Sequence, residues 1–360
     1  MRVVLTNPRG FCAGVRMAIE VVDRAVGLFP DRAFHVYHEI VHNRHVVGRF
    51  RDRGVVFVDN LADVPRGGIV VFSAHGVSPA IRRQATDLGL IAIDATCPLV
   101  TKVHSEAVRY ARQGYQILLI GHADHQEVVG TRGEAPDAIQ VVERVEDIPR
   151  LVIRDPARLV YLTQTTLSTD DAAVIIDALR AAFPGIKAPP TEDICYATTN
   201  RQHAVRQLAP QCDLVLVVGS RNSSNSVRLT EISRNVGTPA FLLDDVTELR
   251  EEWFVPRADG RRGEGDRSDE LVVLLTAGAS APEDLVAGIC RQLLATHGGT
   301  VEQWDVFDED VEFALPVALR RLMTERGVEP PAGGIRVGKP VVTEAAYGGV
   351  PLTVSAGRRA

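Results

Sequence analysis

The feature that most constrains this chain is a recurring unit: a short run of Val, Ile and Leu, a turn with glycine or polar residues, and a stretch with helical periodicity. This alternation is typical of parallel strands that are covered by helices on both faces. The expected strands are 2–5, 54–58, 68–72, 91–94, 116–120, 139–142, 159–162, 213–218, 240–243 and 271–275. The sequence therefore predicts an α/β fold with mainly parallel sheets.

Helices fit into the stretches between these runs. Segment 98–112 places Leu99, Val103, Ala107 and Tyr110 on one face and is followed by Gly114. Proline in its first turn and glycine after its end are both typical of a helix of this length.

Two segments depart from the pattern. Segment 257–269 is charged and glycine-rich, and we interpret it as a surface insertion. The tail 326–360 contains Pro330-Pro331 and Gly333-Gly334 and is expected to lie outside the core fold. Together with the cysteine spacing described below, this gives α/β domains at 1–96 (with the N-terminal strand), 97–194 and 195–325, followed by the tail.

Composition excludes several classes of function. With 360 residues, of which 45% are hydrophobic, the chain can bury a large core. Its formal net charge of -6 provides no overall positive field for nucleic acid or an anionic membrane. No apolar run approaches the roughly 20 residues of a membrane helix, and the first residues contain no apolar signal core. We therefore expect a cytoplasmic protein without nucleic acid or membrane partners.

Five cysteines lie far apart in the sequence, and their odd number argues against a disulfide framework. Cys12, Cys97 and Cys195 each occupy a turn at a predicted helix start, where unpaired backbone N–H groups stabilise a thiolate. Three such thiolates suit an iron-sulfur cluster with one open iron, or less well a zinc site completed by histidine. Buried thiols without a ligand are the alternative. Cys212 and Cys290 fall in apolar segments, which favours core packing for both.

Polar residues also follow the predicted strands, where parallel sheets bind their ligands. The run 220–225 follows a buried strand and opens a helix, so its hydroxyl, amide and backbone N–H groups can bind a phosphate. A simple helix cap is the alternative for any single serine. The other candidates in such turns are His75, His125 and Ser280, and His42 lies in the same kind of turn before a helix without a clear strand before it, although each histidine taken alone could be a core residue.

Glu127 follows His125 by two residues and is a candidate proton donor, because burial near an anion raises the pKa of a carboxyl group. A solvated loop glutamate is the alternative. Thr165 or Thr166, which follow the strand 159–162, could relay a proton.

At this point the motifs resemble those of a known family, the 4-hydroxy-3-methylbut-2-enyl diphosphate reductases. The resemblance covers residues 1 to about 320 and depends on nine motifs in the family's order: GFCAGV, EIVHN, FSAHGVSP, DATCPLVTKVH, GH-x-x-H-x-E, TQTTLS, DICYATTNRQ, GSRNSSNS and TAGASAPE. Three features differ from the family pattern. Gln126 stands where many members have proline, the insertion 257–269 precedes the strand that leads to Ser280, and the tail is longer than expected.

The resemblance implies a cloverleaf of three α/β domains around a central 4Fe-4S cluster, with Cys12, Cys97 and Cys195 as its ligands. It implies Glu127 as the proton donor, with Thr165 as a further catalytic residue. The implied substrate-binding residues are His42, His75, His125, Thr165, Ser223, Ser224, Asn225 and Ser280.

The implied reaction is reductive removal of an allylic hydroxyl group, which gives isopentenyl and dimethylallyl diphosphate in isoprenoid biosynthesis by the methylerythritol phosphate pathway. The chain has no G-x-G-x-x-G nucleotide fingerprint, so electrons are expected from a protein partner such as ferredoxin or flavodoxin. Two alternatives stay open: a non-catalytic iron-sulfur sensor or binding paralogue on the same scaffold, and a zinc-dependent hydrolase.

Overall fold

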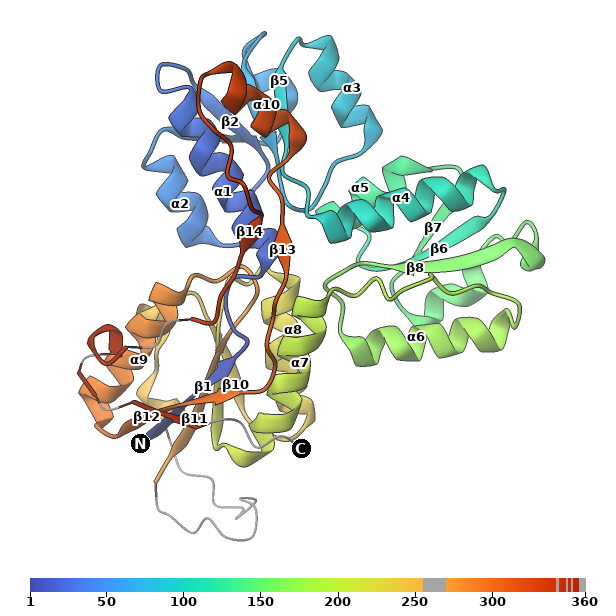
Figure 1. Ribbon diagram of the computed structural model, residues 1–360. Helices are drawn as coiled ribbons and strands as arrows, with labels where there is room; N and C mark the ends of the chain where they lie inside the picture. The colour runs from blue at the N-terminus through green and yellow to red at the C-terminus, as the bar shows by residue number, and fades with distance from the viewer. Residues whose placement is uncertain (255–269, 341–342, 348, 351, 356–360) are drawn as a thin grey trace.

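A computed structural model describes residues 1–254, 270–340, 343–347, 349–350 and 352–355. The chain forms three lobes, each built on its own parallel sheet, and the lobes meet near the centre of the molecule (Figure 1). No helix among the described residues is long and apolar enough to cross a membrane.

The first lobe contains a four-stranded sheet in the order β3-β2-β4-β5, with all neighbours parallel. Its strands are β2 (Phe34–Tyr37), β3 (Val55–Val58), β4 (Ile69–Phe72) and β5 (Ile91–Asp94), and its helices are α1 (Ala13–Leu28), α2 (Arg44–Arg51) and α3 (Pro79–Asp87). The apolar stripe of α1, with Met17, Val21 and Ala25 fully buried, packs in the same core as Val36 and Ile69 of the sheet. This packing fixes the start of α1 near the ends of the strands.

The second lobe is smaller, with a parallel sheet in the order β7-β6-β8. Its strands are β6 (Gln116–Ile120), β7 (Ile139–Val142) and β8 (Leu159–Thr163), and its helices are α4 (Pro98–Arg112), α5 (Gln126–Glu134) and α6 (Thr169–Ala182). All residues of β6 are buried, as expected for a central strand that is covered on both faces.

The third lobe contains a six-stranded parallel sheet in the order β10-β9-β11-β1-β12-β15. Its strands are β1 (Arg2–Asn7), β9 (Leu214–Val218), β10 (Ala240–Leu243), β11 (Val272–Ala277), β12 (Thr300–Asp305) and β15 (Leu352–Ser355). Its helices are α7 (Tyr196–Leu208), α8 (Ser224–Asn235) and α9 (Glu283–His297). The α/β fold with mainly parallel sheets is thus confirmed, and each strand expected from the sequence is present within two residues of its predicted ends.

After β12 the chain returns from the third lobe to the first (Figure 1). There β13 (Glu312–Phe313) and β14 (Ile335–Arg336) form an antiparallel pair, and α10 (Val317–Glu325) packs Leu319 and Met323 against the core of the first lobe. Short 3-10 helices complete the described structure at Leu61–Asp63, Val145–Arg150, Pro156–Arg158, Ala209–Gln211, Val246–Glu248, Glu251–Trp253 and Ala345–Tyr347.

Two expectations about domain organisation need correction. Strand β1 was expected in the first domain, but it pairs with β11 and β12 of the third sheet, where its apolar residues 3–5 are fully buried at a central position. The tail was expected outside the core, but Tyr347 is buried in the third lobe and β15 pairs with β12. The boundaries near residues 96 and 194 stay a prediction, and the insertion 257–269 lies outside the described residues.

Candidate active site

A cavity of about 100 Å³ lies where the three lobes meet. It is lined by side chains from the ends of strands in all three sheets, as expected for parallel α/β units. Every residue singled out as a ligand, substrate-binding or catalytic candidate lines this one cavity: Cys12, His42, His75, Cys97, His125, Glu127, Thr165, Cys195, Ser223, Ser224, Asn225 and Ser280. Residues that are up to 268 positions apart in sequence therefore share one site.

The three cavity cysteines stand at the N-cap positions of α1, α4 and α7, one helix associated with each lobe. Cys12 Sγ accepts a hydrogen bond from the Val15 amide at 3.5 Å, and Cys195 Sγ accepts one from the Thr198 amide at 3.4 Å. Helix N-termini favour negative charge, so these positions suit thiolates.

Burial raises the pKa of all three thiols, and the pKa of Cys195 reaches about 11. The charge of Cys12 also raises the pKa of Cys97 and of Cys195, which means that three thiolates together need a cationic partner. A metal ion deprotonates the thiols that coordinate it, so an iron cluster suits this donor set.

Gly14, in the first turn of α1, leaves room for the sulfur of Cys97. A Cβ atom at this position would lie 2.5 Å from Cys97 Sγ, a distance that ordinary packing does not allow. The glycine therefore keeps space for the Cys97 sulfur beside the start of α1.

In the part of the chain that the structure describes, no group of three His, Cys, Asp or Glu side chains has the arrangement to hold a metal ion. The observation that suits a cluster is the chemistry of the donors, three thiols at helix N-termini in one cavity.

Three histidines form a compact aromatic group on one side of the cavity. The rings of His42 and His75 stack with centroids 4.0 Å apart, and the ring of His125 lies 5.5 Å and 5.9 Å from them, edge-on. Burial is the largest cause of the lowered pKa of His75 and of His125, which falls to about 3. His125 Nδ1 accepts a hydrogen bond from the Glu127 amide at 3.2 Å, so the proton of the neutral ring is on Nε2.

Hydroxyl and amide groups from the third lobe line the cavity beside the histidines. Ser223 caps α8, and Ser280 Oγ lies 3.3 Å from Ser223 Oγ and donates to the carbonyl oxygen of His42 at 2.9 Å. Asn225 Oδ1 accepts from the Ala279 amide at 2.9 Å. These side chains and the start of α8 together form a site suited to an anion.

Glu127 is 2% exposed, which excludes the alternative of a solvated loop residue. One carboxylate oxygen accepts from the Thr165 amide at 2.6 Å and the other from Thr165 Oγ1 at 3.0 Å. Burial raises the pKa of Glu127 to about 7, against the opposing effect of both hydrogen bonds. Gln126 begins α5 and leaves both His125 and Glu127 at the cavity, so the departure from proline keeps both groups.

Several cavity residues escaped the sequence analysis. The Tyr196 hydroxyl oxygen accepts a hydrogen bond from the Ala13 amide of the first lobe at 3.1 Å, and Thr198 Oγ1 lies 3.1 Å from Cys195 Sγ. Because they follow the capping Cys195 by one and three residues, their place in the first turn of the helix could have indicated that they lie near the sulfur. Phe313 also lines the cavity, but it arrives from the returning C-terminal segment, and no local pattern indicated that.

Cys212 and Cys290 are in the apolar cores of the third lobe, 3% and 0% exposed. The prediction that they pack in the core is confirmed.

Comparison with known proteins agrees with this geometry. The model of the LytB protein family matches residues 3–294. The 4-hydroxy-3-methylbut-2-enyl diphosphate reductase of Azotobacter vinelandii is 52% identical over 324 residues, covering 89% of this chain and 98% of its own. The enzyme of the same name from Rhodopirellula baltica is 50% identical over 326 residues, covering 91% and 98%.

A solved structure of the E-1-hydroxy-2-methyl-but-2-enyl-4-diphosphate reductase from Plasmodium falciparum superposes with a TM-score of 0.84 at 39% identity, covering 90% of this chain and 98% of that one. A second solved structure, of (E)-4-hydroxy-3-methyl-but-2-enyl diphosphate reductase, superposes less closely, with a TM-score of 0.57 at 28% identity over 82% of this chain and 99% of that one. The chain belongs to the LytB family of 4-hydroxy-3-methylbut-2-enyl diphosphate reductases.

Proposed function

We propose that this protein is a reductase that converts 4-hydroxy-3-methylbut-2-enyl diphosphate into isopentenyl and dimethylallyl diphosphate. The observation that carries the proposal is the single cavity in which three helix-capping thiols, an anion site and a buried carboxyl group meet. Relatives that bear the reductase name are half identical over nine-tenths of the chain, which supports the same reaction here.

The residues that would hold an iron-sulfur cluster are Cys12, Cys97 and Cys195. Bound there through three thiolates, a 4Fe-4S cluster would supply single electrons and one iron with an open position that acts as a Lewis acid. The helix N-termini at Cys12 and Cys195 donate backbone hydrogen bonds to sulfur, and such bonds tune a cluster's reduction potential.

The diphosphate would bind on the opposite side of the cavity, between the histidines and the third lobe. His42, His75 and His125 come from the first two lobes, and the remaining donors come from α8 and the β11–α9 turn: Ser223, Ser224, Asn225 and Ser280. Burial keeps His125 neutral, and its Nε2–H is then available as a donor to a phosphate oxygen. Holding the charged end in this way orients the allylic end toward the thiols.

Removal of the hydroxyl group as water consumes two electrons and two protons per substrate. Glu127 suits the role of proton donor, because a pKa of about 7 lets it carry a proton near neutral pH and still release it. Thr165 fixes both oxygens of this carboxyl group and can pass a proton between Glu127 and the leaving oxygen.

Electrons would come from a one-electron protein donor such as ferredoxin or flavodoxin, since the sequence has no nicotinamide fingerprint. The reaction would then occur in the cytoplasm, where such donors and the soluble diphosphate are available.

The experiment that tests the function is a turnover assay under strict exclusion of oxygen. Anaerobically purified protein, a chemically reduced donor and the diphosphate substrate should give both five-carbon products. Protein that retains a full complement of iron and sulfide, binds the diphosphate and yields neither product would instead be a binding paralogue.

A further inference from the structure

The loop between β2 and α2, residues 38–43, carries His42 into the cavity and has an unusual backbone. His38 adopts a positive φ of 59°, which is uncommon for residues other than glycine, although His, Asn and Asp do so more often than the rest. Such conformations persist where the surrounding structure fixes them, and they occur often at functional sites. The His38 amide donates to the Val58 carbonyl at 2.8 Å, and its ring lies 2.9 Å from Asp59, so the turn is held in place.

The residue that follows this turn, Glu39, joins the histidine to the third lobe. Its Oε2 atom lies 3.1 Å from His42 Nδ1 and accepts a hydrogen bond from Asn222 Nδ2 at 2.7 Å. Asn222 directly precedes the serines that open α8. We propose that Glu39 is a positioning residue that holds His42 and the α8 turn in register for the diphosphate, an inference that depends on the function proposed above.

The charge on Glu39 decides which nitrogen of His42 carries a hydrogen. The hydrogen bond with His42 is the largest cause of the lowered pKa of Glu39, so Glu39 is a carboxylate and can only accept. His42 Nδ1 must therefore carry a hydrogen. Its other nitrogen, Nε2, is then the one left to the cavity, so the contact with Glu39 fixes the orientation of the ring.

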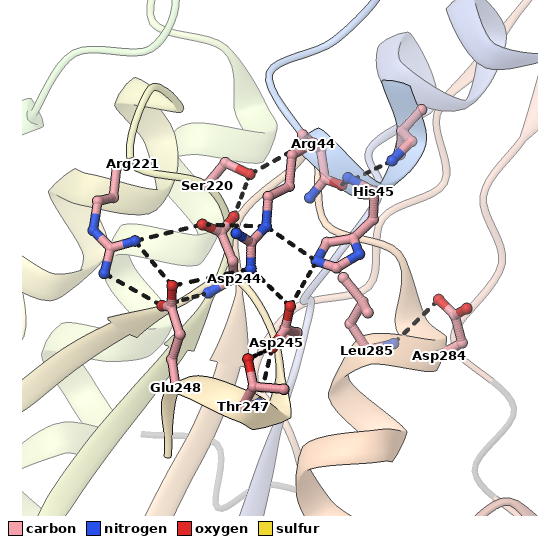
Figure 2. A network of polar contacts seen from close by, with 12 residues as sticks. Arg44, His45, Ser220, Arg221, Asp244, Asp245, Thr247, Glu248, Asp284 and Leu285 are labelled. Carbon is pink, nitrogen blue, oxygen red and sulfur yellow. Dashed lines mark hydrogen bonds and ion pairs between the residues drawn. The ribbon is translucent and has the colours of Figure 1, made fainter. Parts of the chain in front are cut away.

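Other contacts hold the same two lobes together without involving the His42 ring (Figure 2). The Arg44 amide donates to Ser220 Oγ at 3.2 Å, and Ser220 Oγ donates to Asp244 at 2.6 Å. The Arg44 guanidinium pairs with Asp245 at 2.7 Å. Because this network and the bond from Ser280 Oγ to the His42 carbonyl remain, loss of the Glu39 side chain should leave the lobes joined.

Different residues of the cavity therefore serve substrate binding and the chemical step. Glu39 contacts His42, which is proposed to bind the diphosphate. Glu127 and Thr165 instead bond to each other in the second lobe, where Thr165 follows β8. Removal of Glu39 should therefore weaken substrate binding and leave the chemical step nearly intact. That split distinguishes a positioning role from a catalytic one.

The test compares Glu39→Ala, Glu39→Gln and Asn222→Ala as holoenzymes, with Arg221→Ala as the matched control. Arg221 is in the same turn as Asn222 but pairs with Asp244 and Glu248 of its own lobe. Inorganic diphosphate is the probe, titrated by calorimetry, and KM, kcat, cluster absorbance and melting temperature are measured in parallel.

Glu39→Ala should bind inorganic diphosphate roughly ten- to a hundredfold more weakly and raise KM by a similar factor, the range expected for charge-assisted hydrogen bonds. Its kcat, cluster absorbance and melting temperature should stay close to those of the parent protein. Glu39→Gln keeps one acceptor oxygen and should fall between Ala and Glu, Asn222→Ala should show a smaller loss, and Arg221→Ala none.

Two results would overturn the inference. A parent enzyme that turns over its substrate, with Glu39→Ala binding inorganic diphosphate equally well, removes the positioning role. A joint fall in cluster absorbance and melting temperature makes Glu39 merely structural. If the parent protein itself shows neither turnover nor diphosphate binding, the proposed function fails, and with it the basis of this inference.

Discussion

The cavity cysteines and the core cysteines have the same side chain in opposite surroundings. Cys12, Cys97 and Cys195 cap helices at the junction of three lobes, where backbone N–H groups and open space meet the sulfur. Cys212 and Cys290 are packed among Leu, Ile and Val inside one lobe. Burial raises the pKa of Cys290 to about 12, so this thiol stays neutral.

The difference teaches that a pKa raised by burial does not by itself distinguish a candidate ligand from a core residue, since both Cys195 and Cys290 have one. The cavity thiols are partly exposed, they lie where segments from distant parts of the chain converge, and backbone amides at helix N-termini donate to the sulfurs of Cys12 and Cys195. Function therefore depends on what a buried group faces. The following predictions test this comparison in order of expected effect.

The largest effect is expected from the cysteines themselves. Cys12→Ser, Cys97→Ser or Cys195→Ser should each abolish turnover and strip the iron absorbance, because each removes one of only three protein thiolates from the cluster. Cys212→Ser should keep both. Anaerobic absorbance spectra of the variants check this. Loss of the cluster in Cys212→Ser with retention in Cys97→Ser would contradict the assignment of Cys97 as a ligand and Cys212 as a core residue.

A pair of carboxyl groups extends the comparison beyond sulfur. Glu127→Gln keeps the size of the side chain but removes its proton, so turnover should fall by roughly 10² to 10⁴-fold with cluster content unchanged. Asp213, also buried, accepts from the Val272 amide at 2.8 Å and directly precedes β9, at the other end of that strand from the turn that lines the cavity. Asp213→Asn should leave turnover near normal. Steady-state rates with saturating reduced donor separate the two readings, and a fully active Glu127→Gln would assign the proton to another source.

The pH dependence should follow from the raised pKa of Glu127, about 7. A general acid must be protonated, so turnover should fall about tenfold per pH unit above that value, and this limb should be absent in Glu127→Gln. Stability should shift in the same direction. With its folded pKa above the ordinary value of 4.5, Glu127 contributes stability that is fully present below about pH 4.5 and is lost as pH rises through about 7. Rate profiles and melting curves across this window check both, and a rate that rises above pH 7 would contradict the assignment.

The smallest effect is expected in the core. Cys290→Ala removes a fully buried sulfur and should lower the free energy of unfolding by about 1 kcal/mol, as small core truncations do, without loss of iron or activity. Chemical denaturation of the metal-free protein measures it. A stable variant that lost iron would place Cys290 among the functional thiols.

Much of this arrangement could be predicted from the sequence, because parallel α/β units place their ligand-binding turns at the strand ends. The strands were found from apolar runs, and the turns after them supplied most of the cavity candidates, with His42 and Cys195 as exceptions that were found in similar turns before helices. Strand β2 was missed because its four residues include His35 and Tyr37, and a short mixed run carries little periodicity. The sequence therefore did not show that the loop carrying His42 follows a strand.

Contacts between segments that are far apart in the sequence could not be predicted from local patterns. Strand β1 looks like the start of the first lobe, and only the register with Val272 and Thr300 assigns it to the third sheet. Likewise, nothing near Phe313 indicates that it reaches a cavity formed by residues almost 300 positions earlier. Glu39 was missed because its role appears only when Asn222 lies beside it.

The central claim is that three thiolates in the cavity hold an iron-sulfur cluster, and metal analysis of anaerobically purified protein tests it most directly. Iron, zinc and acid-labile sulfide would be measured per chain on the same sample. The account predicts iron and sulfide in equal amounts, about four of each, without stoichiometric zinc. About one zinc per chain with no acid-labile sulfide would contradict it.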